Sequence, residues 1–247
     1  MRLKDKVALV TGAASGFGEG IARRFAEEGA SVLIADIAEE KGKKVAASIP
    51  GARFQAADVA KAADVKAMIE AVLDAFGGLD ILVNNAGFTH RNQPMLDVDE
   101  ETFDRVYAVN VKSIYLTART AVPIMRQQGG GVILNIASTA GVRPRPGLTW
   151  YNGSKGAAIA LTRSMAAELA PERIRVNALN PVIGETGLTS EFMGGDTPEL
   201  RRKFTATIPL GRMSRPLDVA NAALFLCSDE AEFLTGVCLD VDGGRTI

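Results

Sequence analysis

A serine, a tyrosine and a lysine stand at spacings that suit proton transfer. Ser138 precedes Tyr151 by 13 residues, and Lys155 follows Tyr151 by four. Residues i and i+4 share one helix face, so the tyrosine hydroxyl and the lysine ammonium can address the same pocket. A phenol ionises at about pH 10, and a nearby cation is expected to lower its pKa. Tyr151 is therefore the candidate acid or base, and Ser138 is the candidate hydrogen-bond partner of the substrate oxygen. Taken singly, the tyrosine is equally a core aromatic, the lysine a solvated helix residue and the serine a turn residue.

Histidine and cysteine are too scarce to supply that chemistry in another way. The chain has one histidine, His90, and two cysteines, Cys227 and Cys238. A single histidine cannot build a multi-histidine metal site and all but excludes a Ser-His-Asp hydrolase, so no metal is expected. Two cysteines do not make a disulfide framework, and two buried thiols are the simpler interpretation.

A glycine-rich turn follows the first run of apolar residues and leads into an amphipathic stretch. It reads Thr11-Gly12-Ala13-Ala14-Ser15-Gly16-Phe17-Gly18. Glycines at such a turn let the backbone approach a pyrophosphate, which sits at the positive end of the following helix. Asp36 lies 18 residues after Gly18, where a carboxylate accepts hydrogen bonds from ribose hydroxyls and repels a 2′-phosphate. No Arg or Lys stands at Ser15 or Ile37, so NAD is favoured over NADP; the alternative for Asp36 is an ordinary strand-end residue.

Short runs of Val, Ile and Leu alternate with longer amphipathic stretches, which is typical of βαβ units. The expected strands are 7–10, 31–35, 53–56, 81–83, 132–136, 175–179 and 237–241, and the expected helices include 18–28, 64–76, 101–127, 154–169 and 216–226. The strands lack polar alternation, which indicates helices on both faces. With no linker or repeat, residues 1–247 are expected to form a single α/β domain with a Rossmann-like, doubly wound, seven-stranded parallel sheet.

Small and polar residues follow several of these strands. Asp58-Val59 comes after the third strand, and Asn84-Asn85-Ala86-Gly87 comes after the fourth. Ligands of open α/β sheets bind beyond the carboxyl ends of the strands, and small residues there permit close backbone contact. The largest irregular stretch, residues 181–212, follows the sixth strand and is the expected substrate loop.

Charge and hydropathy limit the partners and the location. With 28 Lys and Arg against 29 Asp and Glu, the net charge is −1, which argues against binding to nucleic acid or a membrane surface. Hydrophobic residues make up 47% of the chain, enough for a sizeable core. The charged start Met1–Lys6 leads into a short strand-like run, not a signal peptide, and no apolar run approaches the roughly 18 residues that span a bilayer. A small-molecule substrate and a cytoplasmic location are expected.

Together these motifs resemble the short-chain dehydrogenase/reductase (SDR) family from the first strand to the C-terminus. The residues that carry the resemblance are Thr11–Gly18, Asp58, Asn84–Gly87, Asn110, Ser138, Tyr151, Lys155, Asn180-Pro181 and Thr186. The resemblance implies that Tyr151 is the catalytic acid or base and that Lys155 binds the nicotinamide ribose and tunes Tyr151. It implies that Ser138 orients the substrate oxygen and that Asn110 holds a relay water.

The same resemblance assigns the cofactor contacts and the assembly. It places NAD against Gly12, Ser15, Gly16, Phe17, Gly18, Asp36, Asp58, Val59, Asn85, Ala86, Gly87, Tyr151, Lys155, Pro181, Gly184 and Thr186. Val182 stands where the family usually has Gly, so the backbone around the nicotinamide amide is expected to differ locally. The long helices around 101–127 and 154–169 are expected to pack against partner subunits in a homotetramer.

Two loops carry arginines that suit an anionic substrate. Segments 89–92, 141–150, 183–186 and 236–241 resemble the 4-formylbenzenesulfonate dehydrogenase branch of the family. An arginine fork matches the oxygens of a sulfonate or carboxylate. The candidate substrate residues are His90, Arg91, Arg143, Arg145 and Trp150, with one arginine binding the anion and Trp150 lining an aromatic pocket. The alternative is that these are solvated or interface arginines.

These observations predict an NAD(H)-dependent oxidoreductase that moves a hydride between nicotinamide and an alcohol or carbonyl substrate. The expected substrate class is an aromatic alcohol or aldehyde bearing a sulfonate or carboxylate. With Cys227 and Cys238 near the last helix and strand, an aldehyde is expected to be oxidised as its hydrate instead of through a thiol. The alternatives are a 3-oxoacyl-[acyl-carrier-protein] reductase, which shares the scaffold, and a nucleotide sensor, which would have a broken Ser-Tyr-Lys set.

Overall fold

One parallel sheet organises the chain. The computed structural model describes residues 1–185 and 189–247. Within these ranges the strands are β1 (Val7–Thr11), β2 (Ser31–Asp36), β3 (Arg53–Ala56), β4 (Ile81–Asn84), β5 (Gly131–Ile136), β6 (Ile174–Pro181) and β7 (Cys238–Val241). They lie side by side in the order β3-β2-β1-β4-β5-β6-β7, and all neighbours are parallel. The strand order reverses between β1 and β4, which confirms the doubly wound α/β fold.

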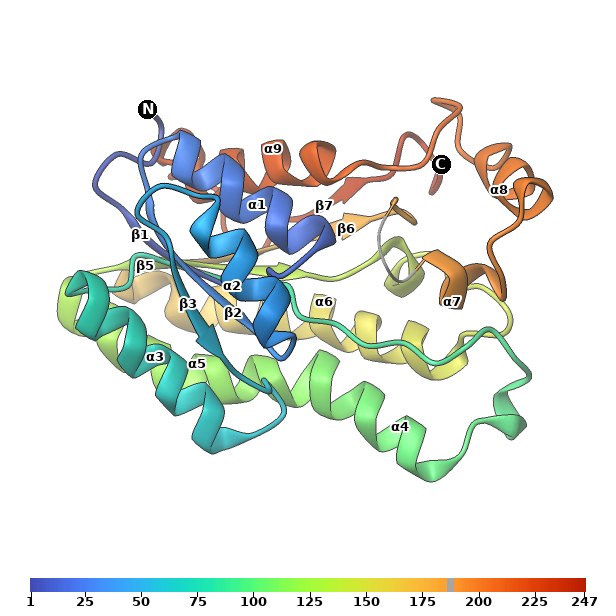
Figure 1. The fold of residues 1–247 in the computed structure, drawn as a ribbon, viewed down its shortest axis with the longest axis horizontal. Helices are drawn as coiled ribbons and strands as arrows, with labels where there is room; N and C mark the ends of the chain where they lie inside the picture. The colour runs from blue at the N-terminus through green and yellow to red at the C-terminus, as the bar shows by residue number, and fades with distance from the viewer. Residues whose placement is uncertain (186–188) are drawn as a thin grey trace.

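Helices cover both faces of this sheet (Figure 1). Their bounds are α1 (Gly16–Glu27), α2 (Glu39–Ala47), α3 (Ala62–Phe76), α4 (Glu100–Tyr107), α5 (Ser113–Gln128), α6 (Thr149–Leu169), α7 (Thr189–Met193), α8 (Pro198–Thr205) and α9 (Pro216–Cys227). One core joins the sheet to α1, α2 and α9, and the other joins it to α3, α5 and α6. Among the described residues, no helix is both long and apolar enough to cross a membrane.

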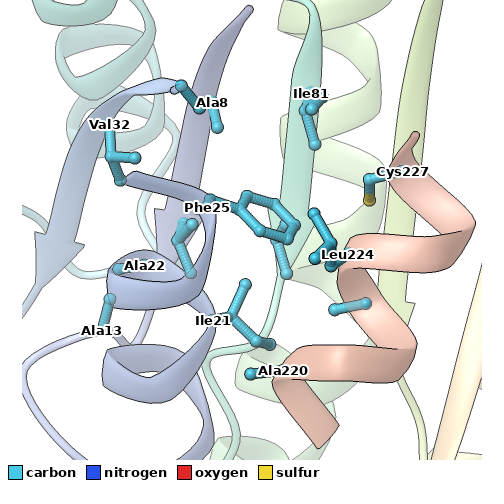
Figure 2. Packing of buried hydrophobic residues seen from close by; sticks show 14 of the residues in the cluster. Ala8, Ala13, Ile21, Ala22, Phe25, Val32, Ile81, Ala220, Leu224 and Cys227 are labelled. Carbon is cyan, nitrogen blue, oxygen red and sulfur yellow. The ribbon is translucent and has the colours of Figure 1, made fainter. Parts of the chain in front are cut away.

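The packing of α1 against α9 fixes the start of α1. Ile21 and Phe25 are four residues apart and therefore lie on one face of α1, where both are fully buried. Figure 2 shows them directed toward Ala220 and Leu224 of α9. Burial of a phenylalanine side chain stabilises the fold by roughly 1.5–3 kcal/mol. This contact holds the glycine-rich turn at the N-terminus of α1 in place.

The structure departs from the sequence prediction in the region of 101–127. The predicted single helix is interrupted by a π-helical segment, Ala108–Lys112, that separates α4 from α5. One residue is thereby inserted into the helical repeat, and such π segments are frequent at functional sites. Asn110 lies in this segment and is buried.

Other elements also differ from the prediction. Helices α2, α7 and α8 were not predicted, because they are short and α2 and α8 are rich in charge, so they show little apolar periodicity. The edge strands β3 and β7 are partly exposed. Helices therefore cover both faces of the inner strands more fully than those of the edge strands.

Candidate active site

A cavity of about 470 Å³ opens at the carboxyl ends of the strands. Its lining draws on the ends of six strands, through Gly12, Asp36, Asp58, Asn85, Ser138 and Pro181. Residues from distant parts of the chain meet there because parallel strands present their carboxyl ends at one edge of the sheet. The strand-end residues predicted from the sequence therefore share one site.

Hydrogen bonds hold the glycine-rich turn against the end of β4. The Asn85 Nδ2 group donates hydrogen bonds to the carbonyls of Thr11 and Gly12 at 2.8 and 3.0 Å. Gly12 has a φ of +64°, and a Cβ there would lie 2.7 Å from Ala86 Cα. A Cβ on Gly18 would overlap the Gly12 carbonyl and the Asn85 side chain. The turn therefore needs glycine at both positions, and it leaves the N-terminus of α1 open toward the cavity.

The Asp36 carboxylate is held firmly at the end of β2. Its Oδ2 accepts a hydrogen bond from the Ala14 amide at 2.9 Å, and its Oδ1 accepts one from the Ala38 amide at 2.8 Å. Asp36 and Ile37 both line the cavity. This places a negative charge beside the glycine-rich turn, where it can accept hydrogen bonds from ribose hydroxyls and oppose a 2′-phosphate.

Asp58 forms an ion pair at the same edge of the sheet. Its carboxylate lies 3.1 Å from Arg105 Nη1 and accepts a hydrogen bond from the Ala60 amide at 3.0 Å. Burial alone would raise the pKa of Asp58, but the Ala60 and Arg105 interactions together lower it. The carboxylate is therefore ionised, and the Arg105 guanidinium is already paired with it.

Ser138, Tyr151 and Lys155 converge on the cavity from the end of β5 and from α6. Ser138 hydrogen-bonds the Tyr151 hydroxyl, and its Oγ accepts a hydrogen bond from the Ala140 amide at 3.1 Å. Lys155 Nζ donates to the Ile136 carbonyl at 2.8 Å and lies 5.8 Å from the centroid of the Tyr151 ring. The structure thus brings together the three residues that the sequence predicted for proton transfer.

Burial dominates the electrostatics of this group. It raises the pKa of Tyr151 to about 12, against the opposing effects of the Ser138 hydrogen bond and the charge of Arg145. Burial also lowers the pKa of Lys155 to about 8. The predicted lowering of the tyrosine pKa is therefore wrong for this structure, because loss of solvation exceeds the effect of nearby positive charge. At neutral pH the phenol is protonated and is poised to donate its proton.

Asn110 fixes the backbone next to the cluster of Ser138, Tyr151 and Lys155. Its Nδ2 donates to the Phe88 carbonyl at 2.8 Å and to Ser154 Oγ at 2.9 Å, and its Oδ1 accepts from the Phe88 amide. The side chain ties the end of β4 to α6 and does not itself line the cavity. The relay water assigned to Asn110 from the resemblance stays a prediction.

Comparison with known proteins identifies the family of this fold and site. The family model described as enoyl-(acyl carrier protein) reductase matches residues 12–246. A 4-formylbenzenesulfonate dehydrogenase of Comamonas testosteroni is 55% identical over 252 residues, covering 100% of both chains. The chain belongs to the short-chain dehydrogenase/reductase family.

Two solved structures resemble this SDR closely. A 3-ketoacyl-(acyl-carrier-protein) reductase from Brucella melitensis, complexed with NADH, has a TM-score of 0.95 and 51% identity, over 99% of this chain and 100% of the other. An NAD⁺-bound xylitol dehydrogenase has a TM-score of 0.93 and 32% identity, over 99% of this chain and 100% of the other. The protein is an NAD(H)-dependent oxidoreductase, and the sequence prediction of its class and cofactor is confirmed.

The residues of this SDR fit the cofactor. The predicted contacts that line the cavity are Gly12, Ser15, Gly16, Phe17, Asp36, Asp58, Val59, Asn85, Ala86, Gly87, Tyr151, Lys155, Pro181 and Gly184. Gly18 lies behind the turn and does not line it, and Thr186 is outside the described residues. Val182 lines the cavity beside Pro181. The backbone cradle, the helix N-terminus and the Asp36 carboxylate are the features that a dinucleotide requires.

The predicted substrate residues divide into two groups. Arg143 and Arg145 line the cavity. His90 is buried with Nδ1 2.8 Å from the Arg91 carbonyl, and Arg91 is exposed. Trp150 donates its indole N–H to the Met95 carbonyl at 3.1 Å and packs against Phe103. These last residues, His90, Arg91 and Trp150, do not line the cavity.

The aromatic wall comes instead from residues that the sequence analysis missed. Phe192 of α7 packs edge-on against Tyr151, with ring centroids 5.1 Å apart. Phe204 of α8 and Arg245 and Thr246 near the C-terminus also line the cavity. Phe192 and Phe204 are aromatic residues within the expected substrate loop, 181–212, and this could have indicated from the sequence that they line the site. Nothing local in the sequence indicates that Arg245 reaches the site.

The pKa of Lys155 predicts how stability changes with pH. The pKa is about 8 in the fold against 10.5 when exposed, so charging the buried amine costs roughly 3 kcal/mol. That cost is fully present below about pH 8 and disappears as pH rises to 10.5, because the unfolded chain binds the extra proton in between. Replacing Lys155 with Met removes the cost, so the cofactor-free variant should gain most over wild type at pH 7 and little at pH 10.5.

Chemical denaturation of both proteins at several pH values measures this difference. Lys66→Met, at an exposed position on α3, is the matched control and should show no such pH dependence. A Lys155→Met advantage that stays constant between pH 7 and 10.5 would contradict the buried-amine explanation.

Proposed function

We propose that this SDR uses NAD to oxidise aromatic alcohols or aldehydes that carry a sulfonate or carboxylate. The proposal rests on the observation that Arg143 and Arg145 line the same cavity as Tyr151. The 4-formylbenzenesulfonate dehydrogenase relative supports this substrate class by its name. Phe192, packed against Tyr151, offers an apolar surface for an aromatic ring.

In the proposed mechanism Tyr151 exchanges the proton of the substrate oxygen. Its hydroxyl donates the proton in reduction and, once ionised, accepts it in alcohol oxidation. Ser138 hydrogen-bonds the same oxygen as charge develops there, and the Lys155 ammonium favours the ionised phenol. The glycine-rich turn and Asp36 would hold NAD, which would supply the acceptor for the hydride of the alcohol carbon. Asn110 is proposed to hold a relay water that returns the proton to solvent.

An aldehyde would be oxidised as its hydrate, whose geminal hydroxyl replaces the alcohol. Cys227 is buried in α9, where burial raises its pKa to about 12, and Cys238 lies in β7. Neither cysteine lines the cavity. A thiohemiacetal route would need an accessible thiolate beside the carbonyl, so hydrate oxidation is the route that these residues support.

A 3-oxoacyl-[acyl-carrier-protein] reductase is the second candidate function. The NADH-bound Brucella melitensis structure favours it, since that protein is 51% identical and carries a ketoacyl reductase name. Reduction of a carrier-bound ketone would use the same Ser138, Tyr151 and Lys155. A non-catalytic nucleotide sensor receives no support, because those three residues are intact and share the cavity.

Initial rates with different substrates test the proposal. Benzyl alcohols with and without a para sulfonate or carboxylate are supplied with NAD or NADP, and an acetoacetyl thioester is supplied with NADH or NADPH. We expect NAD-linked turnover that is faster on the anionic benzyl alcohols than on the neutral one. Thioester reduction without benzylic activity would reject the aromatic substrate and support the acyl reductase.

We also propose that residues 1–247 act as one cytoplasmic domain in a homotetramer, with 181–212 as the substrate loop. Pro181, Phe192 and Phe204 within that stretch line the cavity, which supports the loop assignment.

Tyr115, half exposed on α5, lies on a helix proposed to face a partner subunit. Sedimentation equilibrium at a tetramer mass would support the assembly, and a monomer would contradict it.

A further inference from the structure

The arginines that line the cavity are not equivalent. Arg105 is paired with Asp58, and Arg143 Nη1 donates a hydrogen bond to the Arg245 carbonyl at 2.8 Å. Within residues 1–185 and 189–247, the guanidinium of Arg145 makes no hydrogen bond and no ion pair, although it is half-buried. Arg145 is therefore the arginine whose donors remain available to a ligand.

Arg145 is held in place without any acidic partner. Its guanidinium carbon lies 4.5 Å from the centroid of the Phe204 ring, a cation–π arrangement that orients the planar fork. Its carbonyl accepts a hydrogen bond from Asn152 Nδ2 at 2.8 Å. This bond fixes the Arg145 backbone to α6, one residue beyond Tyr151. Side chain and backbone are thus both positioned before a ligand arrives.

The positive charges of Arg145 and Arg245 favour binding of an anion in the cavity. Burial lowers the pKa of Arg145, and the positive charge of Arg245 lowers it further. Two arginines that approach one another in a half-buried cavity are unfavourable unless a negative charge lies between or beside them. Arg245 lines the same cavity, and its side chain has no hydrogen bond or ion pair among the described residues. A bound anion would offset the repulsion of both.

We infer that Arg145 determines substrate specificity by binding the anionic group of the substrate, with Arg245 beside it and Phe204 beneath its guanidinium. This inference rests on the proposed function and assigns the anion to one of the two candidate arginines. A sulfonate or a carboxylate presents two coplanar or nearly coplanar acceptors to the fork, so either suits the site. Arg143 serves instead to hold the C-terminal segment that carries Arg245.

The position of Arg145 relative to the catalytic tyrosine sets the shape of the substrate. The charge of Arg145 acts on Tyr151, so the anion site lies close to the reacting end of the cavity. Phe192 and Phe204 line the space with their rings. The arrangement suits a flat apolar body with the reactive oxygen at Tyr151 and the anion at Arg145.

Substitution at Arg145 separates charge recognition from catalysis. In Arg145→Gln, kcat/KM for para-sulfonate benzyl alcohol should fall roughly 100-fold, since a charge-assisted fork is lost. The neutral benzyl alcohol should lose far less, because it has no anion for the fork and only the effect of the Arg145 charge on Tyr151 is removed. A thermal melt like that of the wild type checks that the variant folds. Arg145→Lys should recover only part of the loss, because an ammonium cannot bind two oxygens with fork geometry. Arg53→Gln, an exposed arginine on β3 outside the cavity, is the control for net charge.

A binding measurement distinguishes failure of this inference from failure of the proposed function. Benzenesulfonate and benzoate are titrated by calorimetry into wild type, Arg145→Gln and Arg53→Gln in the presence of NAD. Binding that is lost only in Arg145→Gln supports the anion site even if no benzyl alcohol is turned over. The affinities of the two ligands show whether the site prefers a sulfonate or a carboxylate. Unchanged binding, or an unchanged ratio of anionic to neutral kcat/KM in Arg145→Gln, would overturn it.

Discussion

Tyr151→Phe should reduce turnover by about 1,000-fold, within the range of roughly 100- to 10,000-fold for loss of a general acid or base. The change removes only the hydroxyl that hydrogen-bonds Ser138 and leaves the ring that packs on Phe192. The fold and the apolar wall are therefore expected to persist. Cofactor binding should be largely retained, because the glycine-rich turn and Asp36 lie at other strand ends. Single-turnover rates and NADH fluorescence titration measure the two quantities separately.

Tyr115→Phe is the matched control for this substitution. Tyr115 is half exposed on α5 and does not line the cavity, so its loss should leave kcat unchanged. If Tyr151→Phe retained more than about 1% of wild-type kcat on alcohols, another group would have to move the proton. Ser138, whose hydroxyl interacts with that of Tyr151 in the wild type, would then be the first candidate for the acid or base role.

Asp36→Ala should reverse or abolish the preference for NAD over NADP. The substitution removes the carboxylate that is predicted to accept hydrogen bonds from the ribose, which should lower kcat/KM for NAD roughly 10- to 100-fold. The negative charge that opposes a 2′-phosphate is also removed, so kcat/KM for NADP should rise. The ratio of the two kcat/KM values, measured on one alcohol substrate, combines both effects.

Asp36→Asn separates charge from hydrogen bonding at the same position. The amide oxygen can still accept from the Ala14 amide, as Oδ2 does at 2.9 Å in the wild type, but the repulsion of a 2′-phosphate is lost. We expect NADP use to improve in this variant with a smaller loss of NAD use than in Asp36→Ala. A wild-type cofactor ratio in both variants would show that selectivity resides elsewhere in the cavity.

The parts of this protein that the sequence predicted depend on neighbours in the chain. The alternation of apolar runs and amphipathic stretches indicated the doubly wound sheet, because burial on both faces requires it. The turn from Gly12 to Gly18 and the i, i+4 pair of Tyr151 and Lys155 are local patterns. The first fixes a tight strand-to-helix turn, and the second places two side chains on one helix face. Asp36 was found in the same way, from its distance along a βαβ unit.

The tertiary structure alone decided which side chains share the cavity and how they are charged. Arg143 donates a hydrogen bond to the Arg245 carbonyl, about 100 residues away in the chain, whereas the Arg145 guanidinium packs on Phe204 and makes no hydrogen bond among the described residues. Likewise, the pKa of Tyr151 depends on burial by distant segments, which raises it where spacing to Lys155 suggested lowering. Sequence patterns report which face of an element is apolar, whereas solvation and charge at a site depend on every segment that folds over it.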